Sequence, residues 1–140
     1  MNDRQDKGNT VIHHIPSQIM DLMLDVILDI MGAKQGSIML LDDKNQELTI
    51  RSARGLKNEI VKKTRVPLGQ GISGKVAASG QPVFLSGNTG NPKIGIRSDD
   101  LMKPYLYASC VLPIQFHGRT LGTVSVNFED SAHDSHACQE

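Results

Sequence analysis

The sequence predicts an α+β domain: a central, mainly antiparallel sheet of five or six strands, an N-terminal helix on one face, and short helices with a lid loop on the other. Three observations support this fold class. A helical apolar period comes first, alternating extended segments follow it, and short turns join two pairs of these segments. Short turns connect antiparallel strands, whereas parallel strands need long crossovers.

The composition fits one globular domain. The chain has 140 residues, is 39% hydrophobic and has zero formal charge, and a chain of this length buries about two-thirds of its unfolded surface. Its two cysteines form no secreted disulfide framework, and no apolar run approaches the ~18 residues of a membrane span. The N-terminus also lacks a signal-peptide pattern. We therefore expect a cytoplasmic protein without a membrane span.

The first element is predicted to be a helix over residues 17–31, after a flexible lead-in or linker at residues 1–16. Ser17 is a plausible N-cap, and Gly32 is a plausible stop. An acidic residue recurs at every fourth position of this helix, at Asp21, Asp25 and Asp29.

This helix has two apolar faces, separated on one side by the acidic stripe. One face holds Ile19, Leu22, Met23, Val26 and Ile30. The other holds Met20, Leu24, Ile27, Leu28 and Met31, and we expect this second face to form a homodimer interface. The alternative is a helix buried on nearly all sides within one domain.

The extended segments form two predicted hairpins. Residues 37–41 and 47–53 flank a cluster of turn formers, and residues 107–116 and 120–128 flank His117, Gly118 and Arg119. Between the hairpins we expect short helices at 58–63 and 72–79, a strand at 82–85, and a loop at 86–104 that is long enough to be a functional lid.

A G-x-G-x-x-G motif opens the second short helix, at Gly69, Gly71 and Gly74. In a dinucleotide-binding fold this motif follows a buried strand within a parallel sheet. Here Pro67 interrupts the preceding segment, and the hairpins contradict a parallel sheet. We therefore expect the glycines to permit a tight turn and close packing of the first helical turn.

Five segments in order resemble a GAF domain over residues 17–130, with 131–140 left as a polar tail. They are residues 36–42, 52–56, 69–77, 80–83, and 111–114 followed by 118–124. The resemblance implies a PAS-like sensory domain that binds a small molecule or dimerises, and that controls an attached output such as a histidine kinase of a two-component system, a cyclase or a transcriptional activator.

The chain departs from the chemically specialised branches of that family. Asn91 and Lys93 lack the rest of a cyclic-nucleotide signature, and Tyr105 to Tyr107 stand where the haem-binding branch has a histidine. Cys110 is predicted to be buried in a strand, so we expect no catalytic residue and assign no cofactor. The alternatives are a redox enzyme of the free methionine sulfoxide reductase type that uses Cys110, and a pure dimerisation module.

Strand alternation predicts the ligand pocket. One face of the last strand is apolar, with Val124, Val126 and Phe128, and is expected to meet the N-terminal helix. The opposite face, with the lid, is expected to supply the ligand-binding residues Phe84, Arg97, Asp99, Asp100, Tyr107, Ser109, Val111, Thr123 and Ser125. The alternative is a sheet face that the lid simply covers.

Charge suggests the class of ligand. Residues 51–120 carry eleven basic side chains and three acidic ones, which favours a small anion as the first class to test. Nucleic acid is not expected, because aromatic side chains do not alternate with the basic ones. His133, His136 and Cys138 provide too few ligands for a closed zinc site, so no metal is assigned.

Overall fold

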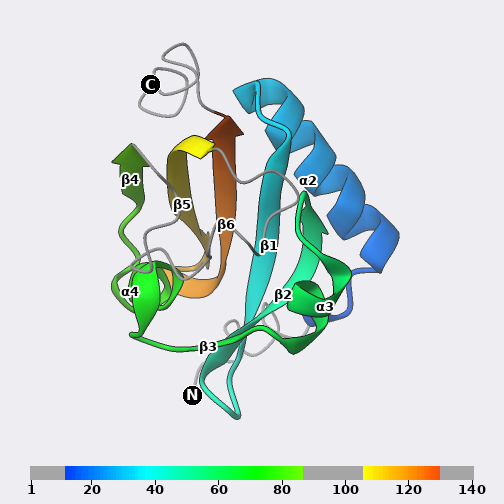
Figure 1. The fold of residues 1–140 in the computed structure, drawn as a ribbon. Coiled ribbons are helices and arrows are strands. Elements are labelled where there is room, and N and C mark those ends of the chain that lie inside the picture. Colours follow the sequence, from blue (N-terminus) through cyan, green and yellow to red (C-terminus); the bar gives the residue numbers. More distant parts are fainter. Residues whose placement is uncertain (1–11, 87–105, 130–140) are drawn as a thin grey trace.

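Six strands form one antiparallel sheet in the order β3-β2-β1-β6-β5-β4 (Figure 1). The computed structural model describes residues 12–86 and 106–129. Its elements are α2 (Ser17–Met31), β1 (Gln35–Asp42), β2 (Glu47–Arg54), α3 (Asn58–Lys63), β3 (Arg65–Pro67), α4 (Gly71–Ser79), β4 (Val83–Ser86), β5 (Leu106–Phe116) and β6 (Arg119–Glu129). The predicted fold class, both hairpins and both short helices are confirmed.

The short strand β3 was not predicted, because Pro67 interrupts the apolar segment that contains it. The structure places this strand at one edge of the sheet, where Pro67 lies opposite Glu47 of β2. An edge strand tolerates proline because its outer side needs no backbone donor.

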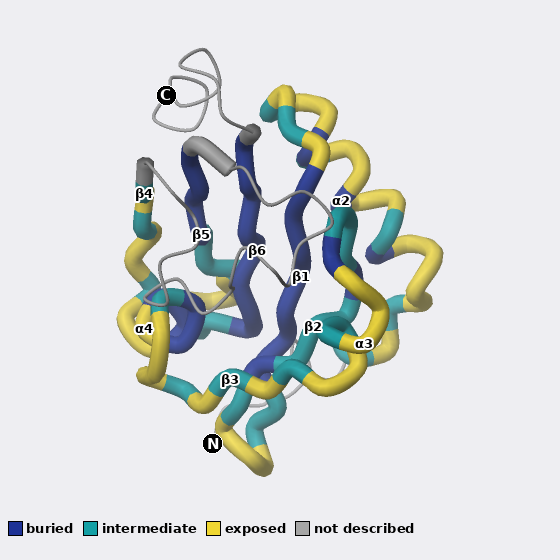
Figure 2. Tube along the Cα trace, in the orientation of Figure 1, coloured by how far each residue is buried: buried dark blue, intermediate teal, exposed yellow. Residues whose placement is uncertain are grey.

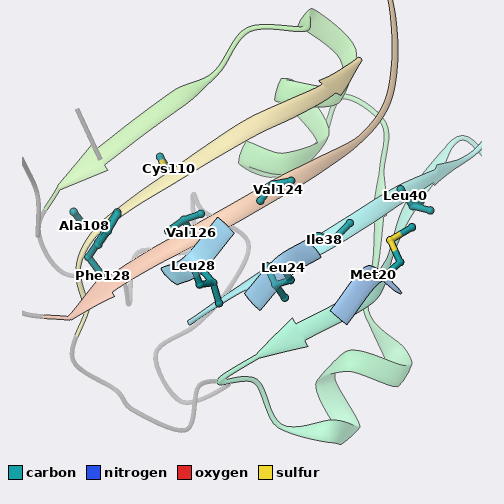
Figure 3. Packing of buried hydrophobic residues seen from close by; sticks show 10 residues of the cluster. All are labelled: Met20, Leu24, Leu28, Ile38, Leu40, Ala108, Cys110, Val124, Val126 and Phe128. Carbon is teal, nitrogen blue, oxygen red and sulfur yellow. The ribbon is translucent and has the colours of Figure 1, made fainter. Parts of the chain in front are cut away.

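The N-terminal helix α2 packs across β1 and the apolar face of β6 (Figure 3). Met20, Leu24 and Leu28 form one row at intervals of four residues, and each is at most 4% exposed. They join a core cluster that includes Val124, Val126 and Phe128, as the strand alternation predicts.

The predicted dimer interface is therefore wrong. Met20, Leu24 and Leu28 are buried within the domain's own core, and Ile27 and Met31 are partly buried against the same cluster. The acidic stripe stabilises this rotation of the helix, because two of its members contact β2. Arg54 donates to both carboxylate oxygens of Asp25 at 2.8 and 3.1 Å, and Ser52 donates to Asp21. The Asp25 hydrogen bond also raises the pKa of Arg54.

The opposite apolar face of α2 is exposed instead. Its five side chains, between 44% and 77% exposed, are Ile19, Leu22, Met23, Val26 and Ile30. We call these five residues the outer face of α2, and Figure 2 shows exposed segments on successive turns of this helix. The amphipathic pattern thus identifies two apolar faces correctly, although it does not identify which of them is inside.

The other side of the sheet packs against α4. Met39, Leu41 and Leu48 form a small core with Ala77 of this helix, and α4 lies beside the lower ends of β5 and β6 in Figure 1. Met39 and Leu41 alternate along β1 with Ile38 and Leu40, which face α2. The two sides of the sheet are therefore covered by different helices.

The glycine motif makes the predicted tight turn into α4. Gly69 and Gly71 have positive φ angles of 89° and 64°, and the Gly69 amide donates to the Gly74 carbonyl at 2.9 Å. A Cβ atom at Gly74 would lie 2.5 Å from the Pro67 carbonyl oxygen. Every described strand pairing is antiparallel, so the parallel unit of a dinucleotide-binding motif is not formed in the described part of the chain.

The end of the predicted lead-in is part of the domain. Ile12 and Ile15 pack against the core cluster, and the Nε2 of His13 donates to the Leu41 carbonyl at 2.9 Å. The predicted N-cap is also one position late, since Pro16 occupies it, and Ser17 begins the helix. Residues 1–11 and the predicted tail at 131–140 lie outside the described residues.

Candidate ligand site

The sheet face opposite α2 carries a band of buried polar side chains on its three central strands. None of these side chains is more than 5% exposed. They are Gln35 and Ser37 of β1, Ser109 of β5, and Thr123, Ser125 and Asn127 of β6. We call these six residues the polar floor. Successive side chains of a strand point to opposite faces of the sheet, so the floor residues alternate along each strand with residues that face α2.

Strand register brings the floor residues together. Ser37 lies directly opposite Ser125, and Asn127 lies between Gln35 on one side and Ser109 on the other. Figure 2 shows β1 and most of β6 as buried, together with the part of β5 that contains Ser109. Side chains directly opposite each other in antiparallel strands have Cβ atoms about 5 Å apart. The floor is therefore a compact patch.

Half of the polar floor has unused hydrogen-bonding capacity. Ser109 donates to Asn127 at 2.8 Å. In contrast, Gln35 Oε1, Ser37 Oγ and Thr123 Oγ1 have no hydrogen-bond partner among the described residues, although all three are buried. A buried polar group without a partner costs about 1–3 kcal/mol. Such groups are rare in folded proteins, so each needs an explanation.

The structure brings together four of the predicted pocket residues and separates one. Ser109, Val111, Thr123 and Ser125 lie on neighbouring positions of β5 and β6. Phe84 is wrongly predicted, because it pairs with Cys110, which belongs to the core beneath α2, and directly opposite residues share a face. The residues of β4 on the floor side of the sheet are instead Val83 and Leu85, which pair with Val111 and Ser109 of β5.

The other predicted pocket residues lie outside what is described. Arg97, Asp99 and Asp100 fall in residues 87–105, and only the backbone of Tyr107 is described. Three residues that were considered as metal ligands and not assigned as such also lie outside the described residues, namely His133, His136 and Cys138.

Three floor residues were not included in the predicted pocket. Asn127 continues the alternation of Thr123 and Ser125, so the sequence pattern contains it. Gln35 and Ser37 are harder to find, because their face is defined only once β1 is known to pair with β6.

The buried thiol of Cys110 lies on the other side of the sheet. Cys110 is fully buried and packs with Ala108, Val126 and Phe128 in the cluster beneath α2 (Figure 3). Its neighbours on β5, Ser109 and Val111, belong to the floor side. The thiol is therefore separated from the polar floor by the sheet itself.

Two open hollows lie near the β1–β2 turn. One, of about 320 Å³, is lined by residues of α4, the β5–β6 hairpin and the β1–β2 turn, and contains the ion pair of Arg119 with Asp43. The other, of about 490 Å³, is lined by His13, Thr49, Arg65 and the β1–β2 turn. Several of their polar groups already have partners within the described residues, since Arg119 pairs with Asp43 and His13 donates to the Leu41 carbonyl.

An antiparallel sheet of six strands, with one helix packed on one face and a second helix and a buried polar patch on the other, defines the class of α+β domains. Comparison with known protein families identifies one family within that class. A family profile described as a GAF domain matches residues 14–137, and the chain belongs to the GAF family.

Solved structures with the same fold are distant in sequence. The GAF domain of a phosphoenolpyruvate-protein phosphotransferase from Coxiella burnetii has 21% identity and a TM-score of 0.69, covering 92% of this chain and 80% of that one. A mutated NreA protein from Staphylococcus aureus, described by its nitrate binding site, has 19% identity and a TM-score of 0.63, covering 81% and 87%.

A third similar structure is an enzyme. Free methionine-R-sulfoxide reductase from Neisseria meningitidis has 17% identity and a TM-score of 0.61, covering 93% of this chain and 76% of that one. No curated protein matches the sequence significantly. At these identities the likeness establishes the fold alone. No helix in the described part of the chain is long and apolar enough to cross a membrane.

Proposed function

We propose that this GAF domain is a non-catalytic regulatory module that binds a small polar molecule on the polar floor and controls an attached output domain. The observation that carries the proposal is a set of three buried atoms that have no hydrogen-bond partner within residues 12–86 and 106–129: Gln35 Oε1, Ser37 Oγ and Thr123 Oγ1. A ligand that bonds to them would remove the cost of their burial. The free energy recovered when these atoms gain partners would add to the affinity for the ligand.

The chemistry of the floor favours a small ligand that carries acceptor atoms for its two unpartnered hydroxyls. The hydroxyls of Ser37 and Thr123 can each donate one hydrogen bond to such a ligand, whereas Gln35 Oε1 only accepts and needs a donor group. No charged side chain belongs to the floor, while the chain between residues 51 and 120 is strongly basic. Nitrate, a small planar anion with three acceptor oxygens, is the first probe, because NreA structures with this fold are described by a nitrate binding site.

Strand β1 connects the floor to the helix. Ser37 faces the floor, whereas its neighbours Gly36 and Ile38 face α2. The helix lies so close to this strand that a Cβ atom at Gly36 would stand 2.9 Å from Leu28. A shift of β1 on ligand binding would therefore be transmitted directly to α2. A ligand with unequal affinity for the two positions of the strand would change their populations.

The experiment is isothermal titration calorimetry with nitrate, followed by other small anions and neutral polar metabolites. We expect saturable binding of one member to the wild type, and at least a tenfold loss of affinity in Ser37→Ala and in Thr123→Val. Thr120→Val is the matched control, since Thr120 lines the 320 Å³ hollow. Equal binding by the floor variants and the wild type, with loss in Thr120→Val, would move the site to the hollow and contradict the proposal.

The second candidate, a cysteine-dependent reductase, has one observation in its favour, namely the fold shared with a methionine sulfoxide reductase. The burial of Cys110 beneath α2 argues against it, because an attacking thiolate must reach the substrate. Turnover of free methionine sulfoxide by the wild type, lost in Cys110→Ser, would favour the enzyme over the sensor.

A further inference from the structure

We propose that His13 and Arg51 form a pH-sensitive clasp, which holds the segment entering α2 on the β1–β2 hairpin at neutral pH and releases it in acid. We call these two residues the clasp. The segment, residues 12–16, packs through Ile12 and Ile15 against the core cluster beneath α2. That cluster and the polar floor lie on opposite sides of the sheet, so the clasp is independent of the proposed ligand site.

Three hydrogen bonds hold His13 on two strands. The ring Nε2 donates to the Leu41 carbonyl of β1 at 2.9 Å. Arg51 of β2 donates through Nη1 to the ring Nδ1 and through Nη2 to the backbone carbonyl of His13, each at 3.3 Å. Both ring nitrogens are therefore bonded, and this one residue links the segment to both strands of the hairpin.

A β-bulge places Arg51 where it can reach His13. Ile38 of β1 lies opposite Ser52, but the next residue, Met39, lies opposite Ile50, so Arg51 is an extra residue in β2. A bulge redirects the side chains of its strand. Here Ile50 packs with the small core beside α4, whereas Ser52, two residues later, donates to Asp21 of α2. The bulge therefore turns the second half of β2 toward the helix and the segment before it.

The partners of the imidazole fix its protonation state. A carbonyl oxygen only accepts, so Nε2 carries a hydrogen, and a guanidinium only donates, so Nδ1 offers its lone pair. The neutral ring with its hydrogen on Nε2 is the one form that satisfies both bonds. Protonation adds a hydrogen to Nδ1 and places a positive charge 3.3 Å from a guanidinium nitrogen. The bond from Arg51 to the ring is then lost, and the two cations repel each other.

The other charged groups around His13 have partners of their own. His14 is its neighbour in the chain, and four groups line the same 490 Å³ hollow, namely Asp42, Asp43, Lys44 and Arg65. Asp42 accepts two hydrogen bonds within the β1–β2 turn, at 2.9 and 2.8 Å, and Asp43 pairs with Arg119. Arg65 lies 3.9 Å from Glu47. The charge in direct contact with the imidazole is therefore that of Arg51.

The direction of the pH response follows from this geometry. Histidine side chains ordinarily change charge between about pH 5 and 8. A released segment accepts the proton without losing a contact, whereas the clasped segment must break the bond to Arg51. A state that binds more protons is favoured as the pH falls, so the clasp weakens in acid. The Pro16 carbonyl accepts from the amides of Ile19 and Met20 at 3.0 and 3.2 Å, so release of this segment alters how the chain enters α2.

Hydrogen exchange measured by mass spectrometry tests the clasp, with rates corrected for the intrinsic effect of pH. In the wild type we expect protection of peptides covering residues 12–20 to fall about tenfold from about pH 7.5 to about pH 5.5, for the loss of one hydrogen bond to a charged group. His13→Gln removes the titrating ring and should abolish this change. Protection that is independent of pH in the wild type, or a change that persists in His13→Gln, would overturn the proposal.

His117→Asn is the matched control for these measurements. It removes a histidine from the β5–β6 turn, away from the clasp, and asparagine tolerates the positive φ of 51° at this position. We expect its segment at residues 12–20 to respond to pH as in the wild type. Loss of the response in this variant would mean that the turn at His117 and not the clasp senses pH.

The protonation state of His13 can also be observed in the folded wild type, without a substitution. Long-range ¹H–¹⁵N nuclear magnetic resonance spectra distinguish the two neutral forms of the ring, and we expect the hydrogen on Nε2 at neutral pH. Arg51→Gln should reduce the pH dependence of exchange, because a glutamine oxygen can accept from a protonated Nδ1. A hydrogen on Nδ1 at neutral pH, or an unchanged response in Arg51→Gln, would contradict the clasp.

Discussion

Replacing Thr123 with valine tests whether the polar floor is built for a ligand at the expense of stability. Thr123 is fully buried in β6, and its Oγ1 has no partner among the described residues. Valine keeps the shape and the β-branched side chain that strands favour but removes the hydroxyl. Since a buried polar group without a partner costs about 1–3 kcal/mol, we expect Thr123→Val to raise the free energy of unfolding by about 1 kcal/mol. In a domain of this size that corresponds to a rise in Tm of about 3–4 °C.

The assay is urea unfolding, with the midpoint compared at constant slope. Ser109→Ala is the matched control, because Ser109 lies on the same floor but donates to Asn127 at 2.8 Å. Its removal leaves a buried acceptor without a donor, so we expect a loss of about 1–2 kcal/mol. The reasoning is refuted if Thr123→Val destabilises the protein as much as Ser109→Ala does, since both hydroxyls would then be satisfied in the unliganded domain.

Three other predictions concern the frame of the site. Gly122→Ala should destabilise the domain by more than about 2 kcal/mol in thermal unfolding, because its Cβ would collide with the Met39 carbonyl oxygen; a neutral result would mean that β1 and β6 are further apart. Arg54→Ala should cost about 0.5–1 kcal/mol, and high salt should reduce the difference, since the pair with Asp25 is largely exposed; a salt-independent cost would argue for packing instead. In a Cys138→Ser background, Cys110 should react with a thiol reagent only as fast as the domain opens, because it is fully buried; rapid labelling in native conditions would favour the redox alternative.

The fold could be predicted from the sequence because each helix, strand and turn is determined by residues that are close together in the chain. Alternation in β6 separates Val124, Val126 and Phe128 from Thr123 and Ser125, and the structure keeps that separation. Turn formers mark both hairpins, and Gly32 ends α2 with a φ of 72°. Each of these features depends on neighbouring residues alone.

The errors arise where distant parts of the chain meet. Both faces of α2 are apolar, and the side that is buried depends on the contacts of Asp21 and Asp25 with Ser52 and Arg54, about thirty residues away. Phe84 illustrates the same limit, since its face is set by its pairing with Cys110. Register across a sheet is not contained in the alternation of one strand.

The proposed site is tested most directly by nuclear magnetic resonance. Amide resonances of the ¹⁵N-labelled protein are followed while a protein-free small-molecule extract of the expressing cells is added, first to the wild type and then to Thr123→Val. We predict shifts concentrated on β1, β5 and β6 around Ser37, Ser109 and Thr123, accompanied by smaller shifts in α2, and much weaker shifts in the variant at the same amount of extract. Shifts confined to the hollow around Arg119, or no shifts with any extract fraction, would contradict the account.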